Sequence, residues 1–176
     1  MLRIKYAISL FLGTVLAVNV LPAENAKAIP LFNMPCIGNP TLKNESVFVA
    51  RRPPINIPIG REFVSEIAFM GITTISNNIR LFPADPVEVV CRLNSKFNNL
   101  NLAFGLDSRE SNDSTRLQIA IFVDGNLVVT RPVTKGPVNS LSVNVINAQN
   151  VSIAVECKQS VSCPRLSFVD MTLKRI

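Results

Sequence analysis

The sequence contains no histidine and no tryptophan, and its single tyrosine is Tyr6, so nearly all of its aromatic side chains are phenylalanines. Without histidine, neither a Ser-His-Asp nor a Cys-His catalytic site can form. Apart from Tyr6, the sequence therefore lacks the two aromatic residue types that combine apolar area with a polar tip. The composition therefore excludes the nucleophilic hydrolases that depend on an imidazole base.

Acidic side chains are the remaining candidates for hydrolytic chemistry. Glu62 and Glu66 are close in sequence, and so are Glu110 and Asp113. A glycosidase needs two carboxyl groups in a cleft, with the pKa of one of them raised. We interpret these acids as solvated surface groups and predict that the protein is not an enzyme.

Lysine and arginine outnumber aspartate and glutamate by 18 to 12, which gives a net charge of +6. Nucleic-acid binding would require a basic stripe interleaved with aromatic rings, and the basic residues here are scattered. We therefore expect no nucleic-acid partner, and we interpret the charge as a contribution to solubility.

Residues 1–28 have the pattern of a signal peptide. Arg3 and Lys5 precede an apolar run, Ala7–Val20, and Ala26-Lys27-Ala28 offers small residues at a cleavage site. The apolar run is shorter than the roughly 20 residues of a spanning helix, although an uncleaved anchor remains the alternative. We predict a secreted, periplasmic or extracellular protein with no membrane span after cleavage.

The four cysteines, Cys36, Cys91, Cys157 and Cys163, all follow the signal peptide. An even count in an oxidising compartment indicates two disulfides, for which three pairings are possible. We favour Cys157–Cys163, which closes a short turn, together with Cys36–Cys91, which ties down the N-terminal segment. A zinc cluster is the alternative, but the short Cys-x-x-Cys spacing is absent.

Period-two alternation of apolar and polar residues dominates the remaining sequence, and no convincing helical stripe is present. Asp124-Gly125 lies between two such segments and predicts a tight hairpin with positive φ at both residues. Residues 29–45 are expected to form an extended lead-in, and residues 46–176 a single all-β, antiparallel sandwich domain. The predicted strands are Val47–Ala50, Phe63–Phe69, Val87–Leu93, Leu117–Val123, Leu127–Val129, Leu141–Val145, Val151–Cys157 and Val169–Leu173.

The phenylalanines in strand-like segments are predicted to pack in the core: Phe63, Phe69, Phe104, Phe122 and Phe168. Phe82 lies beside Pro83 in a predicted loop, so it is the aromatic residue expected to be exposed. Arginine can bind a carboxylate or phosphate through two parallel hydrogen bonds. The candidate ligand-binding residues are Arg51, Arg52, Arg80, Phe82 and Arg109.

The polar loop from Asp107 to Thr115 is rich in oxygen donors, which are the ligands that calcium prefers. The spacing does not match an EF-hand, and the same residue types are ordinary in turns. No cofactor is required by the sequence, but a structural calcium is considered on Asp107, Glu110, Asn112 and Asp113, with a plain loop as the alternative.

Several segments occur in an order that resembles a known family: Ile55–Phe63, Cys91–Ser108 with its Gly-Leu-Asp element, Leu117–Val133 with Val-Asp-Gly, Leu141–Cys157, and Ser167–Lys174. The chain is similar to the NPCBM/NEW2 type of carbohydrate-binding module over about Val47 to Lys174. The resemblance implies a galactose-binding-like jelly-roll sandwich. The histidine- and tryptophan-containing motifs of that family have no counterpart here, so no sugar-binding residue is carried over.

The sequence and the resemblance together indicate a secreted, non-catalytic module for extracellular or cell-wall carbohydrate. The alternative is an envelope protein that keeps the sandwich but has lost the sugar site and binds a protein partner. A concave patch containing the candidate arginines would favour a carbohydrate, and a flat apolar patch on a sheet face would favour a protein.

Overall fold

A computed structural model describes residues 28–38, 48–73, 79–81, 86–159 and 163–175. The expected signal peptide lies outside the described residues except for Ala28, and so does Phe82. The described chain is built almost entirely from antiparallel strands in three sheets, with one short 3-10 helix, η1 (Leu31–Asn33). No helix in these ranges is long and apolar enough to cross a bilayer.

The first layer is a six-stranded sheet, here called sheet A, with the order β11-β8-β14-β4-β3 and β1 paired to β14. Its strands are β1 (Ile29–Pro30), β3 (Phe48–Ile59), β4 (Glu62–Met70), β8 (Phe97–Gly105), β11 (Asn139–Asn144) and β14 (Leu166–Arg175).

The second layer is a five-stranded sheet, here called sheet B, with the order β10-β9-β12-β7-β2. Its strands are β2 (Cys36–Gly38), β7 (Val87–Arg92), β9 (Leu117–Val123), β10 (Asn126–Val133) and β12 (Asn150–Cys157). A small third sheet joins β5 (Ile72–Thr73), β6 (Ile79–Leu81) and β13 (Cys163–Pro164).

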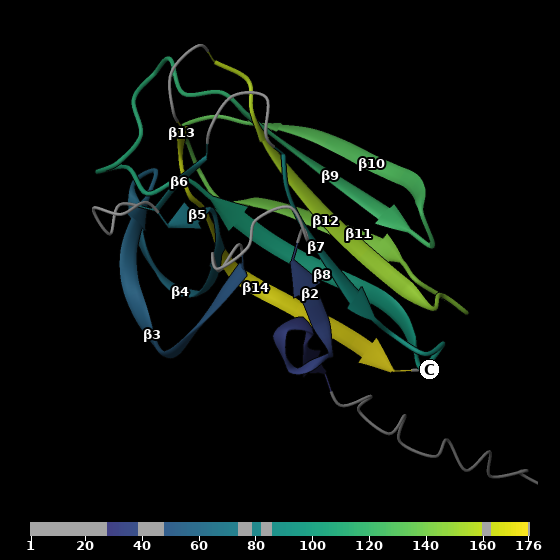
Figure 1. Cartoon of the computed structure of the whole chain (residues 1–176). Helices are drawn as coiled ribbons and strands as arrows, with labels where there is room; N and C mark the ends of the chain where they lie inside the picture. Colours follow the sequence, from purple (N-terminus) through teal and green to yellow (C-terminus); the bar gives the residue numbers. More distant parts are fainter. Residues whose placement is uncertain (1–27, 39–47, 74–78, 82–85, 160–162, 176) are drawn as a thin grey trace, which may run out of the picture.

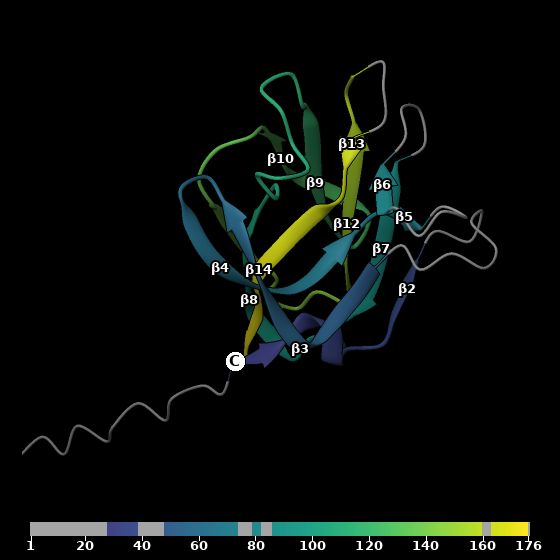
Figure 2. The ribbon, with the colours of Figure 1, turned by 90° about the vertical axis from the view of Figure 1, so that its left-hand side faces the viewer.

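Sheets A and B stack face to face to form a sandwich. Figure 1 shows β12, β7 and β2 in front of β8 and β14, and the turned view in Figure 2 separates the two layers. The predicted all-β jelly-roll class is therefore confirmed.

The core lies between the two sheets and is formed by the inward residues of alternating strands. Leu117, Ile119 and Ile121 of β9 are buried, and Phe104 of β8 meets Phe168 of β14 edge to face, with ring centroids 6.2 Å apart. Because side chains alternate across a strand, each of these strands also has an outward row that the core does not use.

Three expectations about burial are corrected. Phe122 is half-buried on the outer face of sheet B and not in the core, because it alternates along β9 with the inward residues Ile119 and Ile121. Phe63 is 79% exposed because it lies near the β3–β4 hairpin, where it pairs with Pro58 away from the core. Val169 does not share the buried face of Met171 and Leu173, because a register shift between Phe168 and Asp170 places Phe168 inward instead. Alternation alone could not reveal this bulge.

Both favoured disulfides are present. Cys36–Cys91 joins directly paired residues of β2 and β7, and Cys157–Cys163 closes a loop with a sequence separation of 6. The expected lead-in is thus partly structured, since β1, η1 and β2 lie within it.

The Asp-Gly hairpin has the predicted geometry, with φ of 49° at Asp124 and 81° at Gly125. The Asp124 carboxylate also accepts hydrogen bonds from the backbone N–H groups of Gln149 and Asn150, at 3.0 and 2.8 Å. The turn therefore fastens the β9–β10 hairpin to the loop before β12.

Candidate functional site

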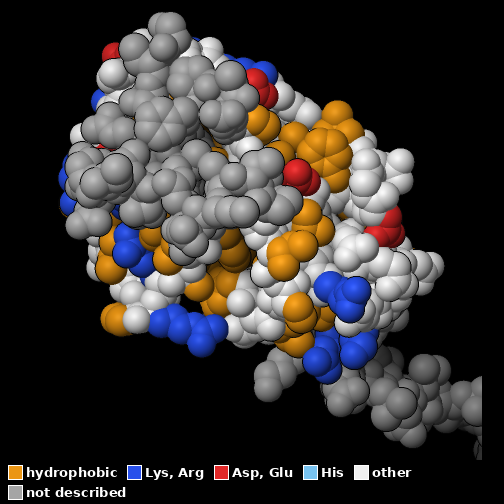
Figure 3. Space-filling view, viewed as in Figure 1, with side chains coloured by type: hydrophobic (Ala, Val, Ile, Leu, Met, Phe, Trp, Pro, Cys, Tyr) orange, Lys and Arg blue, Asp and Glu red, His pale blue; other side chains and the backbone are white. Residues whose placement is uncertain are grey.

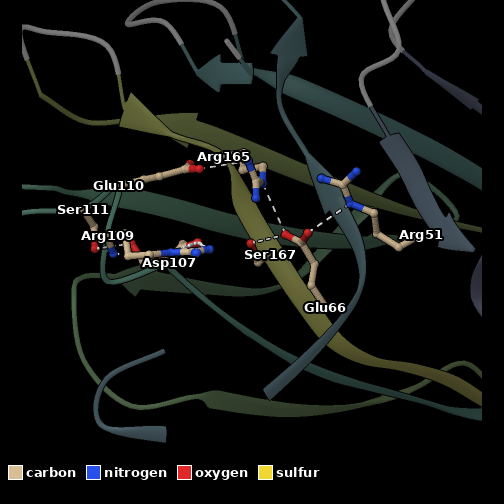
Figure 4. Close-up of polar contacts among 8 residues, drawn as sticks. All are labelled: Arg51, Glu66, Asp107, Arg109, Glu110, Ser111, Arg165 and Ser167. Atoms are coloured by element: carbon tan, nitrogen blue, oxygen red, sulfur yellow. Dashed lines mark hydrogen bonds and ion pairs between the residues drawn. The ribbon is translucent and has the colours of Figure 1, made fainter. Parts of the chain in front are cut away.

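One polar cluster of the described chain surrounds Glu66, a fully buried carboxylate on β4. Its Oε1 accepts hydrogen bonds from Arg165 Nε, at 3.2 Å, and from Ser167 Oγ of β14. Its Oε2 accepts one from Arg51 Nε of β3, at 3.1 Å. Figure 4 shows these side chains converging on Glu66: Arg51 from β3, Ser167 from β14, and Arg165 from the position just before β14. A buried charge is tolerated when it is paired and hydrogen-bonded in this way.

Phe69 lies between the same two arginines. The Arg51 guanidinium carbon is 4.5 Å from the centre of its ring, and that of Arg165 is 5.2 Å from it. Cation–π contacts at this range favour the positive charges, and they hold both guanidinium groups beside the Glu66 carboxylate. Both arginines therefore have partners inside the protein.

Asp107 begins the polar loop after β8 and is also buried. Arg109 folds back onto it, and its Nη2 lies 2.6 Å from Asp107 Oδ2. Burial alone would raise the pKa of Asp107, but hydrogen bonds from the Arg109 side chain and backbone and the positive charges of Arg109 and Arg165 outweigh it. The pKa is therefore held below its ordinary value of 3.8.

The oxygen donors predicted to hold calcium have separate partners. Glu110 Oε1 accepts a hydrogen bond from Arg165 Nη1 at 3.1 Å, and Asn112 Oδ1 accepts from Ser114 and Thr115 within its own turn. Asp113 is fully exposed and lies 4.0 Å from Lys135. The described residues contain no group of three or more acids or cysteines that could hold a metal ion. The calcium site stays a prediction.

The candidate ligand-binding arginines do not gather in one concave patch. Arg51 binds Glu66, Arg109 binds Asp107, and Arg52 donates to Asn33 Oδ1 at 2.8 Å. Arg52 also lies over the ring of Phe32. Arg80 belongs to β6, but its side chain lies outside the described residues, as does Phe82.

A groove that the sequence analysis did not anticipate crosses the outer face of sheet B. Directly paired residues of neighbouring strands point to the same face, so the outward residues form rows across the sheet. One row contains Thr130, Ala120, Ala154 and Glu88. The next row contains Leu127, Phe122, Ser152, Val90 and Ile37.

The small side chains of Ala120 and Ala154 make the first row a depression, here called the Phe122 groove. Its volume is about 340 Å³, and Phe122, half-buried, supplies its aromatic surface. The remaining lining residues are Pro86, Glu88, Gln118, Leu127, Thr130 and Glu156. Figure 3 shows this face, where a broken band of hydrophobic side chains has acidic groups beside it.

The polar side chains of the Phe122 groove differ from those of the Glu66 cluster in their hydrogen-bond partners. The side chains of Glu88, Gln118 and Thr130 make no hydrogen bond or ion pair within the described chain, whereas Glu156 pairs with Lys158. Their donors and acceptors are therefore available to a bound molecule. The signal in the sequence was the outward set Gln118, Ala120 and Phe122, which alternates with the core residues of the same strand.

Two further depressions are lined by described residues. The first, here called the Arg92 groove, lies on the same face of sheet B, has a volume of about 290 Å³, and is lined by Pro35, Cys36, Ile37, Val90, Arg92 and Asn150. The second lies between the β3–β4 turn and the loop before β11, with a volume of about 640 Å³, and it is lined mainly by charged and backbone groups without an aromatic ring.

No protein-family model matches the sequence, and no curated protein matches it. Solved structures do match. The structure of CBM51-2 and INT domains from Clostridium perfringens ZmpB has a TM-score of 0.62 and 13% identity, and the match covers 85% of this chain and 32% of that one. The CBM51 from Clostridium perfringens GH95, in complex with methyl-galactose, has a TM-score of 0.60 and 15% identity, with coverage of 84% and 100%.

A third structure, the M60 catalytic domain with the CBM51-1 and CBM51-2 domains of ZmpB, has a TM-score of 0.58 and 16% identity, and the match covers 85% of this chain but 15% of that one. The chain thus spans a third or less of the length of two of these structures and the whole of the other. At such low identity the similarity concerns the fold. The chain shares the β-sandwich fold of these carbohydrate-binding modules, as the resemblance implied.

Proposed function

We propose that this chain is a secreted, non-catalytic protein that binds extracellular or cell-wall carbohydrate in the Phe122 groove. The observation that carries the proposal is the combination of an accessible aromatic ring with polar side chains that have no partner among the described residues. The shared fold and the two disulfides, which are typical of oxidising compartments, support it.

The chemistry of the groove suits a sugar ring. A pyranose presents apolar C–H groups on one face, which can pack on Phe122, and hydroxyl groups at its edge. Glu88 can accept hydrogen bonds from these hydroxyls, and Gln118 and Thr130 can both donate and accept. A shallow, open groove on a sheet surface gives modest affinity, because much of the ligand stays in contact with solvent.

The test is calorimetric titration of the oxidised protein with neutral oligosaccharides, comparing wild type with Phe122→Ala. We expect the substitution to weaken binding about tenfold, which corresponds to roughly 1.4 kcal/mol. Phe63→Ala is the matched control, because Phe63 is an exposed phenylalanine on sheet A, and its loss should leave affinity unchanged. Equal effects of the two substitutions would rule out the Phe122 groove.

The same samples test the non-catalytic part of the proposal. Glu88 and Glu156 are two carboxylates in one groove, so the oligosaccharides are also incubated with the protein and examined for shorter products by mass spectrometry. We expect none. Products that disappear in Glu88→Gln would instead identify a glycosidase.

The protein-binding alternative has one supporting observation, the exposure of Leu127 (58%) and Ile37 (71%) at the two ends of the Phe122 row. A protein interface on this face would depend on these apolar ends, and its core would be depleted of charged groups. Glu88 and Glu156 in the groove favour a polar ligand instead.

A further inference from the structure

The outer face of sheet B carries opposite charges at its two depressions. Glu88 lines the Phe122 groove and Arg92 lines the Arg92 groove. Both belong to β7 and point outward, and they are four residues apart, which is about 13 Å along a strand. In Figure 3, basic side chains gather near β2 at the lower end of the hydrophobic band, and acidic groups lie beside its upper part.

The two depressions are linked by a shared surface. Val90 lines the Arg92 groove and is paired with Ser152, which is paired in turn with Phe122. The row therefore forms a continuous floor between an acidic end and a basic end. The Arg92 side chain makes no ion pair or hydrogen bond within the described residues, so its guanidinium can receive an anionic group.

We propose that this face binds a segment of heteropolysaccharide in which a neutral sugar occupies the Phe122 groove and a carboxylate-bearing sugar further along the same segment occupies the Arg92 groove. The inference rests on the proposed function and deepens it. Arginine recognises a carboxylate through two parallel hydrogen bonds, while the free carboxylate of Glu88 repels a second acidic sugar at the other end. An alternating polymer satisfies both conditions, and a uniformly acidic one does not.

The Arg92 groove depends on β2, a strand of three residues at the edge of sheet B. Pro35, Cys36 and Ile37 form one wall of the groove, and β2 is held by the Cys36–Cys91 disulfide and by a 3.0 Å hydrogen bond from Arg92 N–H to the Pro35 carbonyl. Because β2 is so short, it can form only a few backbone hydrogen bonds with β7. The disulfide therefore maintains the acidic-sugar half of the site.

The experiment compares three hexasaccharides by calorimetry with the oxidised protein: a hyaluronan hexasaccharide, in which neutral and uronic sugars alternate, chitohexaose, which is neutral, and hexagalacturonate, which is acidic throughout. We expect the alternating hexasaccharide to bind at least tenfold more tightly than the other two. Its advantage should shrink as salt is raised, since an exposed charge pair is screened.

Arg92→Gln should remove the advantage of the alternating hexasaccharide and leave chitohexaose binding unchanged. Arg61→Gln is the matched control, because Arg61 is an exposed arginine outside both grooves of sheet B. Glu88→Gln should improve binding of hexagalacturonate severalfold. The Cys36→Ser, Cys91→Ser variant should lose the same preference as Arg92→Gln, and near-ultraviolet circular dichroism reports whether it folds.

Equal affinities for the alternating and neutral hexasaccharides, or no effect of Arg92→Gln, would overturn the two-sugar inference. If chitohexaose then still binds in a way that depends on Phe122, the proposed function survives. Absence of binding to all three by the folded, oxidised protein would overturn both, and a protein partner would then be sought on the Leu127–Ile37 row.

Discussion

The Glu66 cluster of sheet A and the Phe122 groove of sheet B contain similar chemical groups in opposite situations. Around Glu66, two guanidinium groups and a hydroxyl use both oxygens of a buried carboxylate. In the Phe122 groove, a carboxylate, an amide and a hydroxyl lie beside an aromatic ring and have no partner in the part of the chain that the structure describes. The first arrangement holds strands together, and the second leaves hydrogen-bonding capacity for a ligand.

The comparison shows that residue type is a poor guide to function when partners are unknown. Arg51 and Arg109 were selected as ligand-binding candidates because arginine binds anions well, yet each is engaged by a buried carboxylate. Gln118 and Thr130 have less distinctive chemistry, but their side chains make no hydrogen bond to any described residue and lie beside an accessible ring. Loss of a Glu66 contact should therefore affect stability, and loss of a groove contact should affect binding.

The largest expected effect is that of Glu66→Ala. It leaves Arg165, whose side chain is 11% exposed, without its buried counter-charge, so we expect a loss of about 3–5 kcal/mol in the free energy of unfolding. Urea denaturation followed by circular dichroism measures it. Glu62→Ala is the control on the same strand, since Glu62 is exposed and should cost less than about 0.5 kcal/mol. A loss below about 1 kcal/mol for Glu66→Ala would contradict the structural role.

A smaller effect is expected from the pH dependence of Asp107. Because its folded-state pKa lies below the ordinary 3.8, its ionisation stabilises the fold above that pH, and the contribution is lost as the pH falls below it toward the folded-state pKa. Asp107→Asn should therefore be less stable than wild type at pH 6, and the difference should shrink below about pH 4. Denaturation is measured across this range, with Asp113→Asn as the control at a fully exposed position of the same loop.

The smallest effect on stability, with a large effect on binding, is expected from Ala120→Leu. The added side chain fills the Phe122 groove without removing any polar group, and at a surface position it should change the free energy of unfolding by less than about 0.5 kcal/mol. Calorimetry should show oligosaccharide binding reduced beyond detection. Ala103→Leu, at a partly exposed alanine on sheet A, is the control and should bind normally. Normal binding by Ala120→Leu would place the ligand elsewhere.

Much of the local structure followed from the sequence. Alternation identified most strands of the two large sheets, Asp124-Gly125 specified a hairpin with two positive φ values, and the cysteine spacing favoured the disulfides that are present. These features depend on neighbouring residues or on a chain constraint, so they can be read without knowing which strands pair. The buried state of Phe69, Phe104 and Phe168 followed for the same reason. The same prediction was wrong for Phe63, which is exposed near the β3–β4 turn, and for Phe122, which lies on the outer face of sheet B.

The arrangement of sites was decided by the tertiary structure. Glu66 and Arg165 are 99 residues apart in the sequence, and only the β4–β14 pairing brings them together. The Phe122 groove draws on four strands, and its hollow exists because Ala120 and Ala154 are directly paired. The alternation of apolar and polar residues indicates which face of a strand a residue occupies, but it does not indicate which strand lies beside that strand. Strand pairing depends on contacts between distant segments, and these contacts determine which polar groups find partners and which remain free to bind.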